Sequence, residues 1–302
     1  MKLSIITVKK NLKKIRWLRN FCRYLIDKYD KNIKAPRIYR FLNDKYSYIP
    51  EKYKATELEP IRILDEWQGE AYPVWVIWLQ GEKNMPDCVR ICYYSLLNNA
   101  DGHKVNLITL DNYGHFVDLP EFVLQKYNKG IIPNAHFVDI LRMHLLSKHG
   151  GLYIDATIMV TVPLNLLKLG TSFWTFKCKD IYTLIGLFYV PKMGSHYVSY
   201  LKECFLEYWK KEDKLFSNTL DCYFLDVANI PELMEEIKQV SLYGYNIFSL
   251  EDMYNEPFEE KEWAELCVKY PFHRISYKFP FFLHQKRKLT IYGYLHNKYM
   301  KS

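Results

Sequence analysis

Continuous apolar runs alternate with amphipathic stretches between residues 72 and 165. Residues 72–81 are apolar at nearly every position, which is typical of a central strand buried on both faces. Residues 85–98 show helical periodicity, residues 105–110 predict a second strand, and residues 119–128 predict a short helix. This alternation predicts a mixed, largely parallel α/β sheet with helices on both faces.

The next stretch, residues 136–157, contains several polar side chains of the kinds found in active sites. It predicts a buried helix, a turn at Gly150 and Gly151, and an apolar strand that ends at Asp155. Asp139 and Arg142 lie one helical turn apart, so both can face one cleft. Ligands bind outside the carboxyl ends of strands in open α/β sheets, and glycines let a ligand approach the backbone closely. We therefore expect an active site that contains Asp155, Asp139 and Arg142.

Each of these residues also has a purely structural interpretation. Asp155 could cap a helix or stabilise a turn. Asp139 and Arg142 could form an ordinary ion pair, which is worth only a few tenths of a kcal/mol when exposed. Because their helix is apolar on several faces, the pair would be buried, and burying an ion pair for stability alone is unfavourable. The pattern therefore favours function.

The second half of the chain shows weaker signals. Residues 173–177 and 184–190 predict strands, and residues 198–210 and 230–239 predict helices. From residue 272 onward the sequence is basic and aromatic, without clear periodicity.

The first 40 residues carry most of the net charge of +8. Thirteen Lys and Arg against two Asp give this segment +11, and the remaining residues sum to −3. Apolar positions recur there at spacings of three and four, which predicts an amphipathic helix. Such a helix can lie on an anionic membrane or pack on its own domain, and we leave both open. We expect residues 1–60 to form this helix and a linker, and residues 61–302 to form the main domain, whose near-neutral charge disfavours nucleic acid as a partner.

Composition excludes several classes of protein. We find no apolar run long enough for a transmembrane helix, and lysines interrupt any secretory signal. The seven cysteines include no C-x-x-C pair, which argues against a disulfide framework and a zinc knuckle. The cysteines thus indicate a reducing, cytoplasmic setting. If the basic N-terminal helix lies on the membrane, we expect the protein peripherally at the inner face of the cytoplasmic membrane.

A series of ordered motifs between about residues 70 and 225 resembles one known family. The motifs are Ile77-Trp-Leu-Gln-Gly81, Pro86, Asp111-Asn112, Leu119-Pro120, Asp139-x-x-Arg142 and Gly150-Gly-x-Tyr-x-Asp155-Ala-Thr157. They resemble the capsular polysaccharide synthesis glycosyltransferases, which are related to glycosyltransferase family 32 and have the GT-A fold. Weaker similarity continues to Asp221-x-Tyr-Phe224.

The resemblance implies a donor, a metal and a stereochemical course. The donor would be a nucleotide-diphosphate sugar of the UDP-hexose class, and the anomeric configuration would be retained. Asp155 and Thr157 occupy the positions of a D-x-D motif that holds Mn²⁺ or Mg²⁺, with Thr157 in place of the second carboxylate. Since these cations accept oxygen ligands from diphosphate and water, one protein carboxylate can suffice. Asp139 and Arg142 would contact the donor sugar and its phosphates, and Trp78 would lie near the uracil.

The resemblance also implies further site residues and an acceptor. His284 is the candidate metal ligand from the C-terminal region, and Lys286 would neutralise the departing diphosphate, although a solvated basic tail is an alternative. Asp221 is a candidate contact on the acceptor side. The acceptor would be a lipid-linked oligosaccharide or polysaccharide. The remaining positions expected around the donor are Trp78, Gln80, Gly81, Asp111, Asn112, Gly150, Gly151 and Tyr153.

Two other functions compete with sugar transfer. A non-catalytic, membrane-associated assembly protein could keep the fold and bind only glycan or nucleotide, and Thr157 in the altered motif supports that alternative. A phosphate-ester hydrolase would need several carboxylates around two metals, and only Asp155 is plainly placed for this.

Overall fold

The computed structural model describes residues 71–167, 173–177, 183–215, 230–238, 240, 249–277 and 280–300. All of them belong to one compact unit, residues 48–302. The amphipathic helix expected in residues 1–60, the domain boundary expected there, and Asp221 lie outside the described residues.

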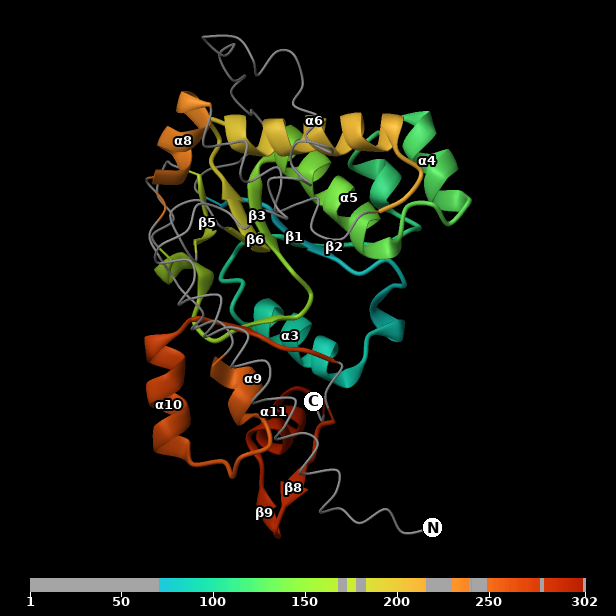
Figure 1. Ribbon diagram of the computed structural model, residues 1–302. Helices are drawn as coiled ribbons and strands as arrows, with labels where there is room; N and C mark the ends of the chain where they lie inside the picture. Colours follow the sequence, from blue (N-terminus) through green and yellow to red (C-terminus); the bar gives the residue numbers. More distant parts are fainter. Residues whose placement is uncertain are drawn as a thin grey trace, which may run out of the picture. The chain divides into compact units, whose positions relative to one another are not determined.

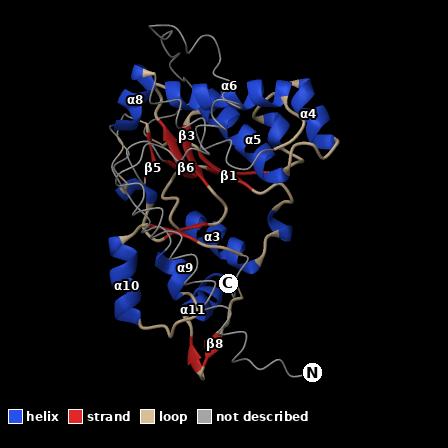
Figure 2. Ribbon diagram, viewed as in Figure 1, coloured by secondary structure: helices blue, strands red, loops and turns tan. Residues whose placement is uncertain are grey.

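A five-stranded sheet forms the centre of this unit, with the strand order β2-β1-β3-β6-β5 (Figures 1 and 2). The strands are β1 (Val74–Ile77), β2 (Val105–Ile108), β3 (Gly151–Ile154), β5 (Trp174–Lys177) and β6 (Thr183–Val190). Strands β2, β1 and β3 run parallel, whereas β6 is antiparallel to both β3 and β5. The predicted mixed sheet is confirmed, and its parallel part corresponds to the region where strands and helices alternate in sequence.

Helices cover both faces of the sheet (Figure 1). Helix α3 (Asp87–Asn98) lies on one face, and α4 (Glu121–Asn128), α5 (Asn134–His149) and α6 (His196–Lys211) lie on the other. All four residues of β1 and all four of β3 are buried, which explains why their sequences are continuously apolar.

The two glycines between α5 and β3 have a structural reason. Gly150 ends the helix with φ 65°, and Gly151 follows with φ 90°. A Cβ at Gly151 would lie 2.2 Å from the carbonyl oxygen of Pro73, so no larger residue fits between β1 and β3 there. The glycines thus serve the turn and strand packing, rather than the ligand approach expected from the sequence.

A smaller layer packs beneath α3 (Figure 2). It contains α9 (Ser249–Met253), α10 (Glu260–Lys269) and α11 (Ile291–Met300), and α11 contacts α3. Strand β4 (Ile158–Val160) pairs with β7 (Phe272–Arg274) in an antiparallel two-stranded sheet.

The other short elements complete the description. Helix α8 (Pro231–Lys238) contacts α6, and the hairpin β8 (His284–Gln285) and β9 (Lys288–Leu289) precedes α11. The described residues also form the 3₁₀ turns η2 (Glu82–Asn84), η3 (Tyr113–His115) and η4 (Leu164–Leu166). In the described part of the chain, none of the helices has the length and apolarity needed to cross a bilayer.

Candidate functional site

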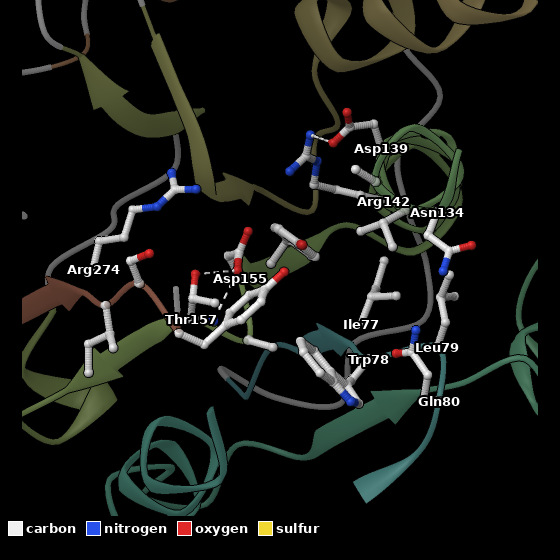
Figure 3. A pocket seen from close by; sticks show the side chains of 17 residues that line it. Ile77, Trp78, Leu79, Gln80, Asn134, Asp139, Arg142, Asp155, Thr157 and Arg274 are labelled. Atoms are coloured by element: carbon white, nitrogen blue, oxygen red, sulfur yellow. Dashed lines mark hydrogen bonds and ion pairs between the residues drawn. The ribbon is translucent and has the colours of Figure 1, made fainter. Parts of the chain in front are cut away.

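A cavity of about 570 Å³ opens beside the carboxyl ends of β1 and β3 (Figure 3). Its volume lies within the usual range for small-molecule sites. Four chain segments line it, namely the end of β1, the first turns of α5, the end of β3, and the chain from the last residue of β7 onward. The lining residues are Ile77, Trp78, Leu79, Gln80, Asn134, Ala135, Val138, Asp139, Arg142, Tyr153, Asp155, Ala156, Thr157, Arg274, Ile275, Ser276 and Tyr277.

Asp155 is held by its own turn. Its backbone N–H donates to the carbonyl of Gly186 at 2.8 Å, which ties the end of β3 to β6. Its Oδ1 accepts hydrogen bonds from the Thr157 backbone N–H at 3.0 Å and from the Thr157 hydroxyl at 2.7 Å. Within the described residues, its Oδ2 has no donor and is available to a ligand in the cavity.

Asp139 and Arg142 form the upper wall of the cavity in Figure 3. The Arg142 guanidinium donates to Asp139 Oδ1 at 2.5 Å. The Asp139 side chain is 16% exposed and the Arg142 side chain is 2% exposed. The guanidinium also lies over the rings of Tyr153 and Phe188, at 4.9 and 5.3 Å from their centroids. These contacts fix the cation in one orientation, so it is already oriented when a ligand enters.

Burial shifts the pKa values of two side chains of α5, Asp139 and His136. Loss of water raises the pKa of Asp139 to about 6, because it outweighs the attraction of Arg142, and the charge of Asp155 adds to the rise. Burial and the nearby Arg142 cation lower the pKa of His136 to about 4. His136 is therefore neutral at pH 7, and its Nδ1 accepts a hydrogen bond from Trp209 Nε1–H at 3.0 Å. It is a packed residue and not a ligand.

The fourth segment of the wall comes from β7 and the chain that follows it. Arg274 pairs with Ile158 across the β4–β7 sheet and reaches the cavity opposite Arg142 (Figure 3). Tyr277 meets the ring of Trp78 edge to face, with centroids 6.2 Å apart. Trp78 thus lies at the cavity wall, as expected, between the end of β1 and a segment about two hundred residues later in the chain.

The cavity contains oxygen atoms that could hold a divalent cation. Its four charged side chains are Asp139, Arg142, Asp155 and Arg274, which sum to zero when all are ionised. The described residues contain no group of three or more His, Cys, Asp or Glu arranged as metal ligands. Asp155 Oδ2 and the Thr157 hydroxyl are oxygen donors of the kind that Mg²⁺ and Mn²⁺ accept, with ligand phosphates and water supplying the rest.

Several predicted positions do not reach the cavity. Asp111 is exposed, and Asn112 uses its side chain to close the turn after β2, through bonds to Thr109 N–H and the Leu107 carbonyl. His284 and Lys286 belong to the β8–β9 hairpin and do not line the cavity.

The glycines expected near the donor also lie outside the lining. Gly81 adopts φ 78° just after β1, and Gly150 and Gly151 join α5 to β3. Each is explained by backbone conformation.

Comparison with known proteins identifies the family. The model of the capsular polysaccharide synthesis protein family matches residues 19–295. The chain belongs to this family. The match covers every segment that lines the cavity, and it confirms the family expected from the sequence motifs.

Two solved structures resemble this family member weakly. One is the glycosyltransferase GlyE of Streptococcus pneumoniae TIGR4, with 15% identity and a TM-score of 0.37, covering 77% of this chain and 64% of that one. The chain thus spans less than two thirds of that protein. The other is the PaToxG glycosyltransferase, with 12% identity and a TM-score of 0.30, covering 77% of this chain and 95% of that one. Neither likeness is close enough to extend a function to this chain, and no curated protein matches it.

The motifs of this family member do not reveal the whole cavity. Asn134, Arg274, Ser276 and Tyr277 line it without having been expected there. Asn134 begins α5 immediately after Pro133, a position that marks a helix start but carries no sign of a ligand. Arg274 follows two buried residues in a strand of three, which is too short for a periodic pattern.

Proposed function

We propose that the protein is a glycosyltransferase of capsular polysaccharide synthesis that uses a nucleotide-diphosphate sugar, with UDP-hexose as the donor class. One observation carries the proposal: Asp155 and the Asp139–Arg142 pair, both expected from the sequence, line one cavity together with Arg274. Family membership supports the role in capsule synthesis.

The charges explain how a donor would bind. A nucleotide-diphosphate sugar brings about two negative charges into a cavity whose own side chains sum to zero, so a divalent cation would accompany it. Asp155 and Thr157 would hold that cation, which supplies Lewis-acid stabilisation of the diphosphate. Arg142 and Arg274, on opposite sides, would orient the phosphate oxygens.

The same residues would favour departure of the diphosphate. Transfer breaks the bond between the anomeric carbon and the diphosphate oxygen, and negative charge grows on that oxygen. The anomeric carbon forms a new bond to the acceptor hydroxyl oxygen, whose proton passes to the departing diphosphate. Fixed guanidinium groups stabilise this charge without reorganisation, so they lower the barrier selectively. Retention of configuration and a lipid-linked saccharide as acceptor belong to the same proposal, on the strength of the family resemblance.

The decisive experiment is the substitution Asp155→Asn. The amide side chain keeps an oxygen that can accept both bonds from Thr157, so D155N removes the charge and preserves the turn. We expect turnover to fall about 1,000-fold or more, which corresponds to roughly 4 kcal/mol of transition-state stabilisation. Release of UDP from a panel of UDP-sugars in the presence of Mn²⁺, together with the mass of the product, measures the effect.

The matched control is Asp118→Asn, at an exposed carboxylate outside the cavity. It should retain parental turnover, and circular dichroism should show both variants folded. If folded D155N turned over within a few-fold of the parent, the donor site would be wrongly placed. Nucleotide binding with no turnover of any donor would instead favour a non-catalytic binding protein.

A further inference from the structure

The β8–β9 hairpin presents three cations around its turn. Lys286 and Arg287 form the two-residue connection, and Lys288 begins β9. All three are exposed. Lys288 lies 3.9 Å from Glu259, but both side chains are more than half exposed, so water and salt weaken that pair. Across the described residues, Lys286 and Arg287 form no ion pair.

The backbone of this turn is unfavourable for the residues it holds. Lys286 has φ 49° and Arg287 has φ 66°, so both occupy the left-handed region. A two-residue hairpin turn with positive φ at both positions strongly prefers Asn-Gly, because side chains with a Cβ are strained there. The chain therefore keeps two long cations where it would fold more easily without them. Strain retained at an exposed site is typical of a functional position.

Two large apolar side chains lie exposed next to the cations. Phe282 is 48% exposed and Leu283 is 42% exposed, immediately before β8. The preceding Phe281 behaves differently, because it is half-buried and stacks on Tyr292 with centroids 4.8 Å apart. Among Phe281, Phe282 and Leu283, the two exposed side chains are therefore the ones nearer to β8.

The base of the hairpin is firmly anchored. The Phe282 N–H donates to Asn255 Oδ1 at 2.9 Å, and the Thr290 N–H donates to the Leu283 carbonyl at 3.1 Å. Gly293 of α11 packs so closely that a Cβ there would lie 2.1 Å from the same carbonyl. From this fixed base, the hairpin projects out of the α9–α11 layer, away from the five-stranded sheet (Figure 1).

We propose that this hairpin docks on an anionic lipid bilayer. Lys286, Arg287 and Lys288 would lie among the headgroups, and Phe282 and Leu283 would enter the boundary between headgroups and acyl chains. A DNA duplex would attract the cations equally well, but its bases are paired and stacked, so it would leave the two apolar side chains without a partner. The proposal is independent of the donor cavity, because it involves none of the residues that line it.

The test is the double variant K286N/R287G in the full chain, measured by co-sedimentation with vesicles of phosphatidylcholine containing about 30% phosphatidylglycerol. Each cation near such a surface contributes about fivefold to binding, so we expect about a 25-fold loss. Because Asn-Gly relieves the turn, the variant should also melt at a higher temperature than the parent. Stabilisation together with lost binding excludes misfolding as the cause.

The matched control, K129N/K148Q, removes two exposed cations from the opposite side of the sheet. It should bind the vesicles within about twofold of the parent. F282S/L283S should weaken vesicle binding as well, because the apolar contact is lost. D155N should bind the vesicles as the parent does, so failure at the donor site would leave this result intact.

Three outcomes would overturn the proposal. The first is unchanged vesicle binding in K286N/R287G. The second is an equal loss in K129N/K148Q, which would reflect overall charge rather than the hairpin. The third is unchanged vesicle binding in F282S/L283S combined with tight binding of a DNA duplex that K286N/R287G abolishes, which would identify a phosphate polymer as the partner.

Discussion

At the residue scale, Asp155 divides its two carboxylate oxygens between two tasks. One oxygen accepts both hydrogen bonds from Thr157 and fixes the turn, and the other faces the cavity. Thr157 thus orients the carboxylate through its backbone N–H and its hydroxyl, which gives this residue a physical role. The turn thus accounts for one carboxylate oxygen, and the role proposed for Asp155 in donor binding depends on the other.

The raised pKa of Asp139 predicts a pH dependence of turnover. Protonation below about pH 6 removes the negative partner of Arg142 and gives the cavity a net positive charge. We expect kcat/KM to fall about tenfold per pH unit well below pH 6, since one proton controls the active form. A pH–rate profile from about 4.5 to 8 tests this. D139N mimics the protonated form, so it should turn over slowly at every pH and lack this limb. If D139N kept the same acidic limb, another group would be responsible.

The same pKa acts on stability in the opposite direction. An unfolded aspartate has a pKa of about 3.9, so between about pH 4 and 6 the folded state binds more protons at Asp139 than the unfolded state does. Its contribution to the free energy of unfolding is therefore largest below about pH 4 and is lost as the pH rises through 6. Activity and this part of stability have opposite trends with pH.

Whether a cavity residue could be predicted depends on how far it lies in the sequence from the other cavity residues. Asp139, Arg142 and Asp155 were expected correctly at the cavity because one helix and one strand, adjacent in sequence, carry all three. Arg274 was missed because only the pairing of β7 with β4 brings it there. His284 and Lys286 drew attention by their residue type, but nothing in a sequence says that a basic hairpin lies away from the sheet.

At the scale of elements, the junction between α5 and β3 is tightly constrained. Its glycines place β3 beside β1, and β3 delivers Asp155 to the cavity. Strands β1 and β3 and helix α5 were predictable because they are long or continuously apolar. The region after residue 272 was not, because its strands have two or three residues and its hairpin lacks the usual Asn-Gly turn.

Replacing Gly151 with Ala tests this junction. The added Cβ would meet the Pro73 carbonyl at 2.2 Å in a backbone with φ 90°, so β1 and β3 must separate. We expect a loss of about 3 kcal/mol or more in the free energy of unfolding, measured by urea denaturation.

Gly130→Ala is the matched control for that substitution. Gly130 has φ 71° but no atom within 4 Å of the added Cβ, so only the backbone cost of about 1 kcal/mol applies. Equal losses in the two variants would show that the contact with Pro73 contributes nothing.

At the scale of the whole molecule, ligand binding should stabilise the fold. The cavity joins β1, α5, β3 and β7, so a ligand that contacts all four resists their separation. At about 100 times its Kd, UDP with Mn²⁺ should add about 2.7 kcal/mol, or roughly 4–5 °C in Tm. Thermal scanning measures the shift, and D155N should show a much smaller one. If the shift in Tm were equally large in excess EDTA, the proposal that a divalent cation helps to bind the nucleotide would be wrong.

Strand β7 lies late in the chain but pairs with the much earlier β4, and this order has a consequence during protein synthesis. A ribosome completes β1, α5 and β3 long before it reaches Arg274 and Tyr277, which close the cavity. The nascent chain can thus assemble much of its sheet while this pocket still lacks one side. A prematurely terminated product that ends before β7 would lack a finished pocket, however well the rest of it folded.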